Sequence, residues 1–129
     1  MDEPVLHGAT IVPVRDVARS MRFYVEVLGF SVDFMRDDGG FAIVRRGPVG
    51  VQLTQTDDIG ALEATANNIA IYITVRNLDA FYTALAPNLA SLPEGRLRPP
   101  FNQPYGMREF HVKCPDGCLL FFASDGKAA

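Results

Sequence analysis

The chain has 129 residues, which is enough for one compact domain with its own hydrophobic core. Its net charge of -3 and pI near 5.2 argue against a nucleic-acid partner, because nucleic acids select basic surfaces. No apolar run approaches the ~20 residues that cross a bilayer, and the first ten residues lack the apolar core of a signal peptide, so we expect a cytoplasmic protein with reduced thiols.

The first predicted elements are a strand over residues 9–16 and a helix that follows it. Alternation places Thr10, Val12 and Val14 on one face of the strand. Asp16 can accept hydrogen bonds from the free N–H groups of the helix. The helix carries an apolar stripe that ends at Leu28, and Gly29 stands where a left-handed terminator belongs.

Three short strands should follow in the first half, at about 31–35, 41–45 and 49–54, with turns at 37–40 and 47–48. Residues 56–68 then form the linker to the second half. The adjacent acids Asp37-Asp38 and Asp57-Asp58 fall in these connections and show no sign of a catalytic role.

The second half repeats the first. Residues 70–77 predict a strand with Ile71, Ile73 and Val75 on one face, followed by the cap Asn77 and a helix that Pro87 ends. Residues 87–105 predict a long loop with one short strand, of the kind that often borders a binding site. A hairpin over 108–113 and 118–123 turns at Pro-Asp-Gly, and the flanking Cys114 and Cys118 are expected to be small apolar strand residues, too few for a zinc site.

This repeat predicts an α+β fold of two tandem βαβββ modules in a single domain, 1–129. Module one spans about 7–55 and module two about 69–123. The modules should form curved mixed sheets around a concave groove, with the helices on the outer face. A ligand site belongs in that groove, because ligand sites are concave and bounded by rigid elements.

Two segments carry a resemblance to a known family. Residues 14–30, which read Val-Arg-Asp-Val through Leu-Gly-Phe, resemble the opening of a vicinal-oxygen-chelate module of the glyoxalase/bleomycin-resistance superfamily. Residues 114–121 resemble its closing hairpin, although Cys114 replaces the usual Asp. Pro13, Gly40-Phe41 and Arg46-Gly47 are similar to the bleomycin-resistance branch. The resemblance implies sequestration of a bulky drug in a groove shared by two subunits, with Pro13 as a hinge for strand exchange in the homodimer.

Metal-dependent members of this superfamily use His, Glu, Gln or Tyr at one position on each of four strands. The matching positions here are Ala9, Gln52, Ala70 and Phe121. A single neutral Gln cannot hold a divalent cation against water. A slip of two residues would add His7, which still leaves fewer than three ligands. We therefore expect no metal, no other cofactor and no catalytic residue of the usual kind.

An apolar, partly aromatic pocket should replace the metal. Alternation places Gln52, Tyr72 and Phe121 on the concave side, together with Ala9 and Leu119. The resemblance adds Phe41 as a wall. Tyr105 ends the long loop, and Arg108 could pair either with an anionic group of a ligand or with a surface acid. The predicted ligand-binding set is Phe41, Gln52, Tyr72, Tyr105, Arg108 and Phe121.

Three functions remain open at this point. The favoured one is a metal-free homodimer that binds a small or bulky organic molecule, such as an antibiotic. The alternatives are an enzyme of the same superfamily (a lyase, isomerase or dioxygenase) with a non-standard metal site, and a structural or partner-binding domain. The sequence indicates neither a nucleic-acid nor a membrane partner.

Overall fold

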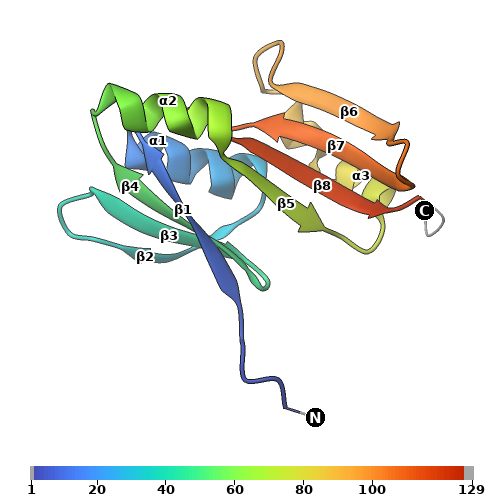
Figure 1. The fold of residues 1–129 in the computed structure, drawn as a ribbon, viewed down its shortest axis with the longest axis horizontal. Helices are drawn as coiled ribbons and strands as arrows, with labels where there is room; N and C mark the ends of the chain where they lie inside the picture. Colours follow the sequence, from blue (N-terminus) through green and yellow to red (C-terminus); the bar gives the residue numbers. More distant parts are fainter. Residues whose placement is uncertain (1, 127–129) are drawn as a thin grey trace.

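The protein consists of two four-stranded sheets that lie side by side, each backed by helices (Figure 1). The structure, a computed structural model, describes residues 2–126. The elements of the first half are β1 (Gly8–Val14), α1 (Val17–Arg22), the π-helix η1 (Phe23–Val27), β2 (Ser31–Met35), β3 (Phe41–Arg46) and β4 (Val49–Gln55). Those of the second half are α2 (Ile59–Asn68), β5 (Ala70–Thr74), α3 (Leu78–Leu89), β6 (Leu97–Asn102), β7 (Met107–Lys113) and β8 (Leu119–Asp125).

The two sheets have the same topology. Their strand orders are β1-β4-β3-β2 and β5-β8-β7-β6, and in each sheet the first strand is parallel to its neighbour while the other pairs are antiparallel. The α+β fold of two βαβββ modules is thereby confirmed, with no closed barrel among the described strands.

The faces of the strands follow the predicted alternation. Val12 and Val14 of β1 and Ile71 and Ile73 of β5 are buried against the helices, and the residues between them point the other way. Asp16 accepts a hydrogen bond from the Arg19 backbone N–H at 3.2 Å, as predicted for a helix cap.

The predicted end of the first module helix is confirmed, and the predicted end of the second is wrong. Gly29 ends the first with a φ of +76°, a conformation that only glycine adopts without strain. The prediction that Pro87 ends the second helix is wrong, because α3 continues to Leu89. Pro87 stands in the last turn, where a missing N–H costs a single bond, and the buried Leu85 and Leu89 hold that turn against the core.

A helix that the sequence analysis did not predict lies in the linker. Asp58, which the sequence analysis placed in the linker, accepts from the Ala61 N–H at 3.0 Å and starts α2. The helix buries Leu62 and Thr65, and the Thr65 hydroxyl donates to the Pro13 carbonyl at 2.7 Å. This contact ties the connection between the modules to β1.

The modules share one hydrophobic core on the helix side of both sheets. Tyr24 of η1 is almost fully buried, and its hydroxyl lies 3.3 Å from the Cys114 sulfur of the second module. Burial raises the pKa of the Tyr24 hydroxyl well above its ordinary value. Cys114 and Cys118 are buried free thiols, as expected of small core residues. This shared core leaves the opposite faces of the two sheets free; they are the faces predicted to line the groove and are called the concave faces.

Candidate ligand-binding site

The concave face of the first sheet is apolar and open. Ile11, Gln52 and Ile43 face one another across β1, β4 and β3 in register. Ile11 is 64% exposed and Phe34 49% exposed, which is far more than core residues of this size show. The Phe34 and Phe41 ring centroids lie 6.1 Å apart, so the predicted wall residue Phe41 belongs to an aromatic pair on this sheet.

The concave face of the second sheet carries an aromatic row. Tyr72 of β5, Phe121 of β8 and His111 of β7 are neighbours in register. The His111 and Phe121 rings stack with centroids 4.0 Å apart, and the Tyr72 ring centroid lies 6.0 Å from that of Phe121. Tyr72 is 49% exposed, so the row offers a flat ring surface to a ligand.

A buried carboxylate lies beside this row. Glu109 of β7 has no exposed surface, and four side chains make hydrogen bonds to it. The Tyr72 hydroxyl donates to Oε2 at 2.8 Å, and the Tyr105 hydroxyl donates to the same oxygen. Gln103 donates to Oε1 at 2.9 Å, and Nε2 of His111 lies 2.8 Å from Oε1. Each carboxylate oxygen is therefore bonded twice, which satisfies its usual acceptor capacity.

These contacts decide the charge of Glu109. Burial by itself raises the pKa of the carboxyl, but the hydrogen bonds from Tyr105, Gln103, His111 and Tyr72 outweigh it and lower the pKa to about 2. Burial and the bond to Glu109 raise the pKa of Tyr72 to about 12. The pKa of Tyr105 is raised as well, chiefly by its bond to Glu109. At neutral pH the cluster therefore holds an anionic carboxylate and two neutral phenols.

The structure brings together three of the six predicted ligand-binding residues. Tyr72, Tyr105 and Phe121 lie in or beside the Glu109 cluster. Gln52 and Phe41 lie on the other sheet, on adjacent strands β4 and β3.

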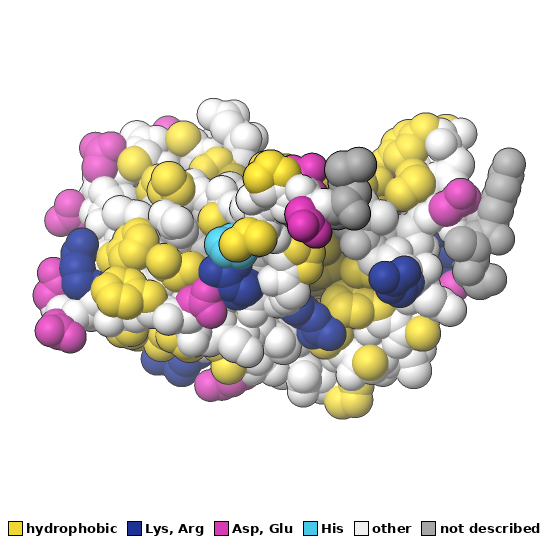
Figure 2. All heavy atoms as spheres, turned by 90° about the horizontal axis from the view of Figure 1, so that it is seen from below, with side chains coloured by type: hydrophobic (Ala, Val, Ile, Leu, Met, Phe, Trp, Pro, Cys, Tyr) yellow, Lys and Arg dark blue, Asp and Glu magenta, His cyan; other side chains and the backbone are white. Residues whose placement is uncertain are grey.

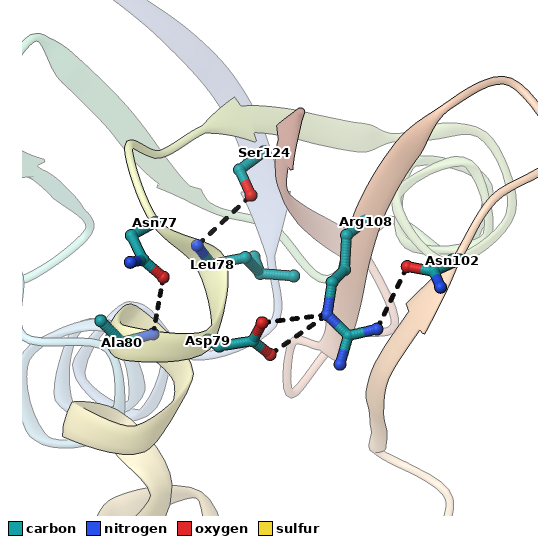
Figure 3. A network of polar contacts seen from close by, with 7 residues as sticks. All are labelled: Asn77, Leu78, Asp79, Ala80, Asn102, Arg108 and Ser124. Carbon is teal, nitrogen blue, oxygen red and sulfur yellow. Dashed lines mark hydrogen bonds and ion pairs between the residues drawn. The ribbon is translucent and has the colours of Figure 1, made fainter. Parts of the chain in front are cut away.

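Arg108 is placed on the helix side of β7. Its Nε donates to both carboxylate oxygens of Asp79 in α3, at 3.1 and 3.2 Å, and its Nη1 donates to Asn102 of β6 at 3.2 Å (Figure 3). In the same network Asn77 caps α3 through the Ala80 N–H. These contacts join α3 to the sheet, so within the described residues the guanidinium serves the packing of that helix.

The sequence analysis missed Glu109, His111 and Gln103. A signal was present, because Phe110 and Val112 are apolar and alternation assigns them to the core, which turns Glu109 and His111 toward the face of Phe121. Gln103 lies in the β6–β7 turn, and no pattern in the sequence indicates that this turn folds back onto the sheet.

The positions that match metal ligands do not form a metal site. Ala9 and Ala70 offer no donor atom, and the register sets Gln52 opposite Ile11 and Phe121 opposite Tyr72. Tyr72 could ligate only as a phenolate, yet its proton is donated to Glu109 and its pKa is raised. Among residues 2–126 no group of three or more His, Cys, Asp or Glu side chains is arranged for a metal ion. The residues present therefore do not fit the family's metal.

Cavities lie at the junction of the modules and beside His111. One of about 300 Å³ opens where the modules meet, lined by apolar side chains of Phe30, Ile73, Phe81 and Phe122 and by Arg46. Figure 2 looks onto this side of the molecule and shows a hollow containing hydrophobic side chains to the right of its centre. A smaller cavity of about 140 Å³ adjoins His111 on the side of Arg98 and Lys113. A third cavity of about 420 Å³ is lined by polar residues such as Arg36, Gln55 and Asp57. The apolar junction cavity therefore competes with the concave faces as a site for an apolar ligand.

Comparison with known proteins identifies the family. The model of the Glyoxalase/Bleomycin resistance protein/Dioxygenase superfamily matches residues 6–122. The chain belongs to this superfamily. Among curated members, a bleomycin resistance protein of Geobacillus stearothermophilus is 26% identical over 131 residues, covering 92% of this chain and 96% of the relative. A bleomycin resistance protein of Staphylococcus aureus matches to the same extent. The resemblance inferred from the two sequence segments is thus confirmed.

Solved structures of superfamily members are similar over most of their length. The bleomycin-binding protein from bleomycin-producing Streptomyces verticillus, complexed with copper(II)-bleomycin, is 29% identical with a TM-score of 0.72, covering 91% of this chain and 93% of that one. A bleomycin-binding protein complexed with bleomycin is 24% identical with a TM-score of 0.73, covering 92% and 98%, which shows the shared fold. Within residues 2–126, no helix is long and apolar enough to cross a membrane.

Proposed function

We propose that this protein is a metal-free binding protein of the superfamily that sequesters an organic ligand, with bleomycin-type antibiotics as the first candidates. The observation that carries the proposal is the aromatic row on the concave face of the second sheet. Phe121 occupies a position that matches a metal ligand of the family, and it stacks on His111 instead. A ring surface suits a planar organic group, and it cannot ligate a metal. The relatives that bind or resist bleomycin support the choice of ligand.

We further propose that two copies form the complete groove. One copy leaves both concave faces open, with Ile11, Phe34 and Tyr72 exposed. A two-fold dimer could cover these faces and enclose a bulky ligand, as closed symmetric pairs commonly do. The proposed site is built from Phe41 and Gln52 on one sheet and Tyr72, Tyr105 and Phe121 on the other. The buried free thiols suit the cytoplasm, which is the compartment we propose.

Calorimetric titration of EDTA-treated protein with bleomycin tests the proposal. Saturable binding without added metal is expected, and the drug should be recovered chemically unchanged, as sequestration requires. Binding that requires a restored divalent metal, or a chemically altered product, would instead support the alternative of an enzyme with a non-standard metal site.

A further inference from the structure

The hydroxyl protons of Tyr72 and Tyr105 are committed to one buried acid. Both hydroxyls donate to Oε2 of Glu109, while Gln103 and His111 occupy Oε1. A phenol has one proton and two acceptor lone pairs, so each hydroxyl retains only acceptor capacity toward a ligand. Tyr72 is 49% exposed and Tyr105 is 61% exposed, so both residues belong to the accessible part of the concave face.

The negative charge of Glu109 also favours a cationic ligand group over an anionic one. Glu109 has no exposed surface, so its negative charge is screened less by water than that of a surface acid. A cation above the site is attracted by this charge, and it can also lie against the electron-rich faces of the Tyr72 and Phe121 rings. An anion would meet acceptor oxygens and a buried like charge.

Positive side chains lie on the β6 side of the row. Arg98 of β6 pairs with His111 in register and stacks its guanidinium over the Phe101 ring at 3.5 Å, and Lys113 lies two residues beyond His111 on β7. Along residues 2–126, no acid forms an ion pair with Arg98 or Lys113. Tyr72 and Phe121 stand on β5 and β8, the two strands away from β6, so a cation at the Glu109 end of the face is favoured on their side of the carboxylate.

We propose that the Glu109 end of the concave face selects cationic ligand groups, with the Tyr72 and Tyr105 hydroxyl oxygens accepting hydrogen bonds from an ammonium or amidinium that lies beside the Phe121 ring. Glu109 is a positioning residue in this scheme, because it orients both hydroxyls and contacts no ligand atom itself. The inference rests on the proposed function, since it names the chemical class of ligand for the same face.

Three small probes of one shape test the charge preference. Benzamidinium, benzamide and benzoate share a phenyl ring and a planar head group but carry a positive, zero and negative charge. In titrations followed by amide NMR shifts at Tyr105 and Gly106, benzamidinium should bind about tenfold more tightly than benzamide, as for one hydrogen bond to a charged group, and benzoate most weakly. Benzoate binding there as tightly as benzamidinium, or no benzamidinium shifts at tens of millimolar, would overturn the proposal.

Two variants separate the acceptor oxygens from general folding effects. Tyr105→Phe removes one hydroxyl acceptor and should weaken benzamidinium about tenfold and the neutral donor benzamide by clearly less. Tyr82→Phe, which alters a ring packed on Phe110 on the helix side, is the matched control and should change neither. Glu109→Gln should abolish the preference for the cation; if this variant does not fold, Tyr72→Phe replaces it. Equal loss of benzamidinium and benzamide in Tyr105→Phe would contradict the assignment.

Bleomycin titrated against the same proteins keeps the two proposals distinguishable. If the wild-type protein selects benzamidinium but does not bind bleomycin, the cation site is supported and the proposed drug is wrong. If bleomycin binds and both Tyr105→Phe and Glu109→Gln leave its affinity unchanged, the proposed function is supported and the cation site is wrong.

Discussion

Phe121 and Phe122 are adjacent on β8 but face opposite sides of the sheet. Replacing each with Ala therefore distinguishes a residue of the groove from a residue of the core. Phe122 is 1% exposed and packs against Phe81 and Phe110 with ring centroids 5.2 and 5.0 Å away. Phe122→Ala should therefore cost ~3–5 kcal/mol, as for a fully buried ring. Phe121 contacts His111 on one face and is only partly buried, so Phe121→Ala should cost about half as much, ~1.5–2.5 kcal/mol.

Urea denaturation followed by circular dichroism measures both costs, with unchanged m-values as the sign that the variants unfold from a native-like state. Phe121→Ala should also weaken bleomycin binding by tenfold or more, the effect of losing a main aromatic contact. Equal destabilisation by the two substitutions, with bleomycin affinity retained by Phe121→Ala, would show that Phe121 is core packing and that the groove assignment is wrong.

The remaining predictions concern acid, metal and assembly. The pKa of Glu109 is about 2, below the ordinary 4.5, so its stabilisation is complete above about pH 4.5 and is lost as the pH falls toward 2. Between about pH 6 and pH 3 the wild type should lose ~1–3 kcal/mol more than Glu109→Gln in urea titrations, and identical pH profiles would refute this. EDTA should leave the melting temperature unchanged; a fall of several degrees would reveal a structural metal. Light scattering should give twice the 14.1 kDa chain mass, and a monomer at tens of micromolar would contradict the proposed dimer.

Much of the fold could be predicted because it depends on short-range patterns. Alternation in β1 and β5 identified the buried faces, and the Asp16 and Asn77 caps identified the helix starts. The repeat then predicted the βαβββ module, since each half of the chain carries the same pattern. At Pro87 two patterns compete. The proline predicted a helix end, but the helix continues because the buried leucines on either side outweigh the cost of one missing hydrogen bond.

The site was harder to predict because its decisive contacts join distant residues. The aromatic members Tyr72 and Phe121 follow from strand alternation, but their relation to Glu109 depends on how the β6–β7 turn brings Tyr105 back to the sheet. Arg108 illustrates the converse case. Its charge left a ligand group and a surface acid open as partners, and the acid, Asp79, lies on a helix whose packing on β7 no local pattern reveals.

A crystal structure of the EDTA-treated protein with bleomycin tests the central claim most directly, because it locates the ligand. The account predicts density for the drug on the concave face, with a planar group against Phe121 and Tyr72 and no metal bound to the protein. Density instead in the apolar cavity between the modules, beside Phe30 and Phe81, would contradict it.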